Sequence, residues 1–150
     1  IIMLRASGIQ KSYGPLKVLK NIDLQIAKGE IVAIVGASGA GKSTLLHILG
    51  TLDNPDAGKV FIHDTDVFAQ SSRNLAAFRN QRIGFVFQFH NLLPEFSALE
   101  NILIPGLIGG KDPRDIRRRA EQLLECARAL DDSVNRIQAI AKAIRLGYIA

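Results

Sequence analysis

Eight consecutive residues, Gly36 to Ser43, constrain the fold of this chain more than any other segment. They read Gly-Ala-Ser-Gly-Ala-Gly-Lys-Ser and satisfy every fixed position of the pattern G-x-x-x-x-G-K-[ST]. The aliphatic run Ile31 to Val35 precedes them, and a helical pattern from Lys42 to Leu49 follows. A strand, a glycine-rich turn and a helix in this order aim backbone amides and the positive end of a helix dipole at one point. The segment therefore predicts a phosphate-binding loop, or P-loop.

Each position of this loop has a physical role in binding a nucleotide. The glycines allow a tight backbone path, so that successive amides can point at phosphate oxygens. Lys42 supplies a full positive charge for the β and γ phosphates, and the Ser43 hydroxyl is suited to ligate Mg²⁺. The alternative interpretation is a glycine-rich surface turn with an exposed lysine. The predicted nucleotide-binding residues of the loop are Gly36, Ala37, Ser38, Gly39, Ala40, Gly41, Lys42, Ser43 and Thr44.

Hydrophobic periodicity predicts the elements around this loop. Ile22, Leu24 and Ile26 alternate with polar residues, which is typical of a half-buried strand. The uninterrupted run Ile31 to Val35 predicts a strand buried on both faces, as in parallel sheets covered by helices. Ser97 to Glu100 forms a capping box, which predicts a helix start. Further strands are expected at 59–63 and 83–87, a turn at 54–58, and helices at 42–49, 72–82, after Asp112-Pro113 and at 134–144.

Composition and charge exclude several classes of protein. The chain is 47% hydrophobic and 22% charged, as in folded globular proteins. No apolar stretch approaches the ~20 residues of a membrane-spanning helix, and no basic leader precedes an apolar segment. We therefore expect a cytoplasmic protein. The net charge of +5 includes arginines after Lys111 that are interleaved with acids, which favours a solvated helix face and no nucleic-acid partner.

The segments before the P-loop resemble a known family. Tyr13-Gly14, then 18–24 and Gly29-Glu30, are similar to the opening of an ATP-binding cassette (ABC) ATPase. In that family an aromatic residue at the position of Tyr13 stacks on adenine. The resemblance implies ATP and Mg²⁺ as ligands. Without the family, Tyr13 is equally well explained as a surface turn residue.

Gln88 follows the predicted strand at 83–87, where the family carries its Q-loop glutamine. That glutamine reaches Mg²⁺ and the attacking water, so the resemblance implies Ser43 and Gln88 as metal-side residues and Gln88 as a catalytic-loop residue. A lone glutamine after a strand carries no meaning by itself. His90 has no second ligand at metal-binding spacing, so it is not expected to hold a metal ion, and the resemblance implies that it is a partner-facing loop residue.

The run from Gly84 to Asn101 narrows the resemblance to the lipoprotein-releasing branch, the LolD-type ATPases. This branch implies integral-membrane permease subunits as partners, contacted by the loop from Gln88 to Phe96. It also implies a head-to-tail ATPase dimer and a peripheral location at the inner face of the cell membrane. Two alternatives stay open: the ATP-binding subunit of a macrolide-exporter-type transporter, and a non-catalytic nucleotide-binding module.

The resemblance covers about Leu4 to Glu125, and three motifs of the family are not found in this sequence. They are a Leu-Ser-Gly-Gly-Gln type signature, an apolar strand that ends in Asp-Glu, and a switch histidine. We therefore expect an α/β, P-loop NTPase-like ABC ATPase core that is incomplete: antiparallel strands, a parallel strand with the P-loop helix, then a helical segment. Such a chain would bind Mg-ATP but lack a complete catalytic set. The expected organisation is a nucleotide-binding core at 1–95, a helical segment at 96–130 and a tail outside the family at 131–150.

Overall fold

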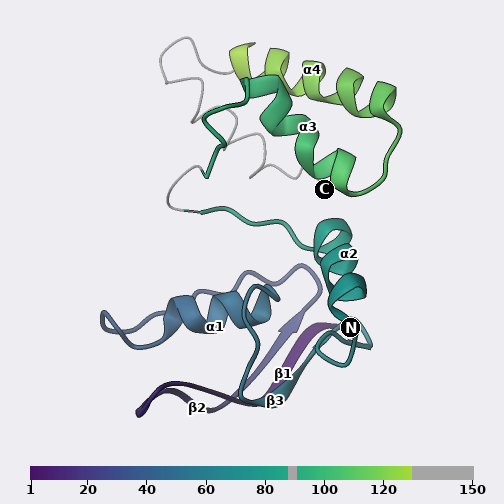
Figure 1. The fold of residues 1–150 in the computed structure, drawn as a ribbon. Coiled ribbons are helices and arrows are strands. Elements are labelled where there is room, and N and C mark those ends of the chain that lie inside the picture. The colour runs from purple at the N-terminus through teal and green to yellow at the C-terminus, as the bar shows by residue number, and fades with distance from the viewer. Residues whose placement is uncertain (88–90, 130–150) are drawn as a thin grey trace. The chain divides into compact units, whose positions relative to one another are not determined.

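The computed structural model describes residues 1–87 and 91–129 (Figure 1). The chain divides between Ala76 and Ala77 into two compact units. Its elements are β1 (Ile2–Tyr13), β2 (Leu16–Ala27), α1 (Lys42–Leu49), β3 (Ala57–Ile62), β4 (Thr65–Asp66), α2 (Ser72–Arg82), α3 (Ala98–Ile108) and α4 (Pro113–Ala129).

An antiparallel sheet with the strand order β2-β1-β3-β4 forms the base of the first unit. In β2, Ile22, Leu24 and Ile26 are half-buried and alternate with exposed residues, which confirms the predicted strand. The short strand predicted at 59–63 is confirmed as β3. The buried apolar side chains of this unit are Ala6, Ile9, Leu19, Leu45, Ile48, Leu49, Val60, Ile62 and Val67.

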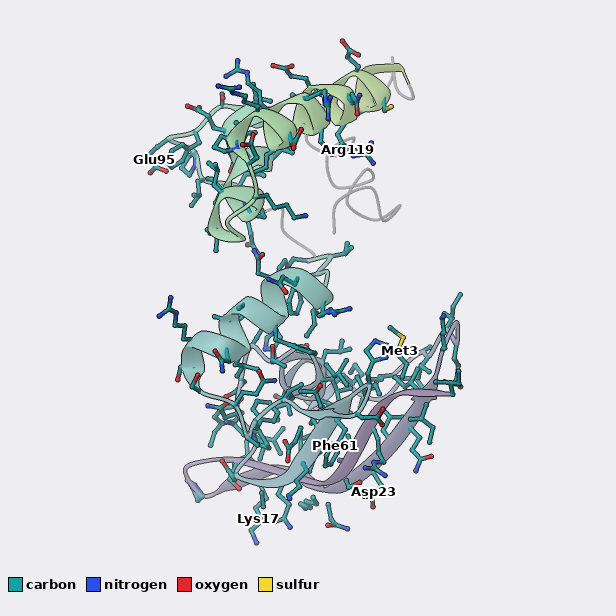
Figure 2. The ribbon with its side chains drawn as sticks, turned by 90° about the vertical axis from the view of Figure 1, so that its right-hand side faces the viewer. Met3, Lys17, Asp23, Phe61, Glu95 and Arg119 are labelled. Atoms are coloured by element: carbon teal, nitrogen blue, oxygen red, sulfur yellow. The ribbon has the colours of Figure 1, made fainter. Side chains whose placement is uncertain are left out.

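Backbone contact between β1 and β3 fixes one point of the sheet. Gly58 has a φ of +97°, and a Cβ atom added there would lie 2.5 Å from the carbonyl oxygen of Gly8 and 2.7 Å from that of Ser7. Asp23, which is labelled in Figure 2, lies on β2. Its carboxylate accepts a hydrogen bond from the Gly8 amide at 2.8 Å. Glycine is therefore required at position 58, where the pairing of β1 with β3 shifts register.

The parallel-type buried strand predicted at 31–35 and the short strand predicted at 83–87 are not observed, and both predictions were wrong. The backbone at 31–35 and at 83–87 is irregular. Ile31 is 98% exposed and Val35 is 86% exposed, so the aliphatic run before the P-loop is not a buried strand. A central parallel strand needs a hydrogen-bonding neighbour on each side and a helix on each face. The strand pairs of the described residues are all antiparallel, so these segments have no such neighbours there.

Helices α3 and α4 pack together in the second unit through Ile102, Ala120 and Leu123. The predicted capping box is confirmed: the Glu100 amide donates to Ser97 Oγ at 3.3 Å, and the Ser97 amide donates to Glu100 Oε2 at 2.8 Å. The helix predicted after Asp112-Pro113 is confirmed as α4, and Asp112 Oδ1 accepts the Arg114 amide at 2.8 Å. The helix predicted at 134–144 lies outside the described residues.

No helix within residues 1–87 and 91–129 has the length and apolar character needed to cross a membrane.

Candidate nucleotide-binding site

The P-loop turns sharply into α1 at Gly41. Gly41 is the N-cap residue of this helix and has a φ of +84°, a left-handed conformation that favours glycine. A Cβ atom added there would lie 2.8 Å from Val18 Cγ1 and 2.9 Å from Leu19 Cδ2. The motif glycine is thus required both by its own conformation and by its close approach to β2. The sequence motif alone predicted the first requirement only.

The first turn of α1 presents free backbone donors. No side chain caps this end of the helix, and the Leu45 amide donates to the Gly41 carbonyl at 2.9 Å. The amides of Lys42, Ser43 and Thr44 therefore precede the first intrahelical hydrogen bond and have no helical partner. Such a group of amides at the positive end of a helix favours an anion.

Lys42 folds back along the loop. Its Nζ atom donates to the carbonyl oxygens of Gly36 at 2.9 Å and Ala37 at 2.6 Å. The ammonium is thereby held beside the loop backbone whose amides are suited to phosphate. Ser43 is exposed, so its hydroxyl is accessible to a metal ion bound with the phosphates.

The end of β1 brings Tyr13 into the same unit as the P-loop. Tyr13 is 51% exposed and pairs with Leu16 across the β1–β2 hairpin. The same β2 strand contacts Gly41 through Val18 and Leu19, so the hairpin connects the aromatic ring to the loop. This arrangement suits the base-stacking role that the resemblance implied for Tyr13.

Asp53 is a residue of this region that sequence reasoning missed. Its Oδ2 accepts a hydrogen bond from the Tyr13 hydroxyl at 3.0 Å, and its Oδ1 lies 2.8 Å from Lys11 Nζ. The hydrogen bond from Lys11 is the main cause that lowers the pKa of Asp53, and in return the carboxylate raises the pKa of Lys11. The only signal in the sequence was the turn predicted at 54–58, which gave no reason to connect Asp53 with Tyr13.

Gln88 and His90 lie outside the described residues, so the predicted metal-side role of Gln88 stays a prediction. No group of three or more His, Cys, Asp or Glu residues that could hold a metal ion occurs in the described ranges. The fit to Mg²⁺ therefore depends on the exposed Ser43 hydroxyl together with phosphate oxygens. That donor set is all oxygen, as Mg²⁺ prefers.

Comparison with known proteins identifies the family. The sequence profile of the ABC transporter family matches residues 19–146. The chain is 57% identical over 122 residues to the lipoprotein-releasing system ATP-binding protein LolD of Cytophaga hutchinsonii, covering 81% of this chain and 56% of that protein. The LolD of Bacteroides thetaiotaomicron is 59% identical over 122 residues, with the same coverage. The chain thus spans about half the length of the curated relatives it matches.

Solved structures confirm the predicted fold class. The ATP-binding cassette MJ0796, in a dimeric post-hydrolysis state bound to ADP and Pi, is 34% identical and has a TM-score of 0.80, covering 97% of this chain and 70% of that one. A second dimeric structure of MJ0796 has a TM-score of 0.81 at 33% identity. The predicted resemblance is therefore confirmed: this chain belongs to the ABC transporter family.

Proposed function

We propose that this chain binds Mg-ATP at the P-loop and serves as the ATP-binding part of an ABC transporter. The observation that carries the proposal is the P-loop, where a left-handed Gly41, free first-turn amides and a folded-back Lys42 converge. The amides and Lys42 bind the phosphates, and the Ser43 hydroxyl ligates Mg²⁺. Mg²⁺ held there would supply positive charge that offsets the phosphate charge, and the ring of Tyr13 stacks on adenine.

Lys42 dominates this binding site energetically. One unit charge about 4 Å from another contributes about 4 kcal/mol at an effective dielectric near 20. The helix N-terminus contributes only about 0.3–1 kcal/mol at an exposed site. We therefore expect Lys42→Ala to weaken Mg-ATP binding by several kcal/mol, measured by isothermal titration calorimetry.

Lys28→Ala removes the same charge at the exposed end of β2 and should leave the affinity unchanged. Equal affinity for Mg-ATP in the native chain and Lys42→Ala would contradict the assignment.

A second part of the proposal concerns the transport system. The similarity to LolD proteins, at 57% and 59% identity, supports a role in lipoprotein release. On this proposal the chain works at the inner face of the cell membrane, beneath permease subunits, as one half of an ATPase dimer. The solved cassette that it resembles is itself dimeric.

The segment before α3 supports this docking role. The Asn101 amide nitrogen Nδ2 donates to the carbonyl oxygens of Leu93, Phe96 and Ser97 at 3.0–3.1 Å, so one side chain holds the turn in shape. Leu93 and Phe96 are each 45% exposed, and Glu95 is exposed beside them (Figure 2). A preformed turn that presents apolar side chains suits a protein partner.

Site-specific cross-linking tests the partner. A photo-cross-linker at Glu95 should capture a permease subunit of a lipoprotein-release system, whereas one at Arg118 on α4, which is also exposed, should not. Capture of macrolide-exporter permeases would favour the other branch. Capture of soluble proteins alone would count against both transporter assignments.

A non-catalytic nucleotide-binding module is the second candidate for these 150 residues taken alone, which match 56% of the length of the LolD relative. No acidic residue after Gln88 in the 150 residues follows four apolar ones, and His90 is the last histidine. The 150 residues by themselves thus do not include several preorganised groups of the family, each of which typically contributes about 10²- to 10³-fold in rate. We expect phosphate release by the purified chain to equal that of Lys42→Ala. Turnover near ~1 s⁻¹ that Lys42→Ala abolishes would overturn this candidate.

A further inference from the structure

The cluster of Lys11, Tyr13 and Asp53 links the end of β1 to the segment that follows α1. Lys11 and Tyr13 are two residues apart on β1, where the pairing with β2 shifts register between Lys11 and Ser12, and both side chains reach the same carboxylate. Asp53 uses a different carboxylate oxygen for each: Oδ1 for the Lys11 ammonium at 2.8 Å and Oδ2 for the Tyr13 hydroxyl at 3.0 Å. The carboxylate is therefore shared by two side chains that come from a distant part of the sequence.

Two further contacts fix the carboxylate itself. The Asn54 amide donates to Asp53 Oδ1 at 2.8 Å, and Lys11 Nζ also donates to the Asn54 carbonyl at 2.6 Å. The Lys11 side chain is only 12% exposed and that of Asp53 is 32% exposed. Partial burial reduces the competition from water, so this ion pair is better defined than a pair on an open surface.

The Tyr13 ring is held from two sides but stays accessible. A tyrosine side chain has two main torsions, and a hydrogen bond at its hydroxyl restrains both. Lys11 Nζ lies 5.5 Å from the ring centroid, over one ring face. Because Tyr13 is 51% exposed, the ring still offers surface for stacking.

We propose that Asp53, held by Lys11, is a positioning residue for adenine recognition: it fixes the Tyr13 ring in the orientation that stacks on the base. This inference rests on the proposed binding of ATP. In this proposal Asp53 acts through Tyr13, whose hydroxyl it holds at 3.0 Å. Its loss therefore weakens recognition of the base and leaves phosphate binding, which depends on Lys42 and the loop amides, largely intact.

The test compares a ligand that has a base with one that lacks it. Mg-ATP and Mg-tripolyphosphate are titrated by calorimetry into the native 150-residue chain, Tyr13→Phe, Asp53→Asn and the double variant. Tyr13→Phe keeps the aromatic ring and removes only the hydroxyl, and Asp53→Asn keeps the shape of the side chain. Each single variant should bind Mg-ATP about three- to tenfold more weakly, as expected for loss of one restraining hydrogen bond. The double variant should be no weaker than the weaker single variant, because both changes break one interaction.

Binding of Mg-tripolyphosphate should change by less than about twofold in all three variants, because the phosphate contacts persist. Asp56→Asn is the matched control. Asp56 Oδ2 accepts the Ser12 amide at 2.7 Å, which fastens the same segment to β1 without touching Tyr13. This variant should retain the native ratio of the two affinities. Thermal unfolding followed by circular dichroism confirms that each variant is folded before titration.

Three results would overturn the inference, and they separate it from the proposed function. If Asp53→Asn and Tyr13→Phe bind Mg-ATP as the native chain does while Lys42→Ala does not, the P-loop assignment stands and the positioning role is wrong. If Asp53→Asn loses Mg-ATP and Mg-tripolyphosphate affinity in equal measure, Asp53 only maintains the fold. If the native chain shows no Lys42-dependent binding of either ligand, both proposals fail together.

Discussion

The β1–β2 hairpin and the aliphatic segment at 31–35 lie a few residues apart in one compact unit, yet they differ in backbone pairing and in exposure. The hairpin contains exposed lysines and two glycines, Gly8 and Gly14, yet each of its strands is twelve residues long and hydrogen-bonded along its length. The segment at 31–35 is entirely apolar, but Ile31 and Val35 are almost fully exposed. Apolar content thus does not by itself make a strand. A strand forms where the chain supplies a partner for its backbone groups.

The difference also reveals what supports the phosphate site. Because 31–35 is irregular, the P-loop does not rest on a strand that precedes it. It rests on β2, through the contact of Gly41 with Val18 and Leu19, and on the buried side chains Leu45 and Ile48 of α1. The hairpin therefore carries Tyr13 and also supports the turn of the loop at Gly41.

Truncation of apolar side chains should show the difference between the two regions most strongly. Ile9 of β1 is fully buried, and we expect Ile9→Ala to lower the free energy of unfolding by about 2–5 kcal/mol through lost burial and a cavity. Ile31→Ala removes the same atoms from an exposed side chain, so it should change the free energy of unfolding by less than about 0.5 kcal/mol. Urea denaturation of the two variants provides the measurement. Equal destabilisation would show that 31–35 is buried in solution.

Crowding between β1 and β3 should produce the next largest effect. Gly58→Ala places a methyl group against the backbone of Gly8 in a left-handed conformation, so the strands must separate. We expect a loss of about 2–4 kcal/mol in the free energy of unfolding. Gly14→Ala is the matched control, since its φ is +58° but nothing lies within 4 Å of the added atom. It should cost only the conformational strain, about 1 kcal/mol. A Gly58→Ala variant no less stable than Gly14→Ala would mean that β1 and β3 do not approach this closely.

Local signals explain what the sequence could predict here, and long-range pairing explains what it could not. The P-loop helix, the helix at 72–82 and the Ser97 capping box depend on neighbouring residues and were predicted correctly. The strand at 31–35 needed partners from distant segments, which an apolar run does not specify. The role of Asp53 could not be predicted for the same reason, because its contacts with Lys11 and Tyr13 span about forty residues of sequence. The family resemblance implied the role of Tyr13, but it did not indicate Lys11 and Asp53, the side chains that contact Tyr13.

The pH dependence of stability should show the smallest effect. The pKa of Asp53 is lowered below its ordinary value of 3.8, chiefly by the hydrogen bond from Lys11. Its stabilising contribution is therefore complete above about pH 3.8 and is lost as the pH falls through the lowered value. A partly exposed pair contributes about 1 kcal/mol or less. The difference in free energy of unfolding between the native chain and Asp53→Asn should reach this size at pH 7 and shrink below pH 3.8. A difference in the free energy of unfolding that does not vary with pH would show that the charge of Asp53 does not cause the effect.

The most direct test of the account follows the backbone amides of the P-loop by NMR. Mg-ATP is added to the isotope-labelled 150-residue chain, and amide shifts are recorded for Gly36, Gly39 and Gly41 of the loop, Thr44 of α1 and Ile31 of the preceding segment. We predict saturable shifts at the loop glycines and Thr44, the same pattern with Mg-tripolyphosphate, little change at Ile31, and loss of all shifts in Lys42→Ala. Loop amides that do not respond to either ligand, or that respond equally in Lys42→Ala, would contradict the claim that this loop, held by the β1–β2 hairpin, is a phosphate site.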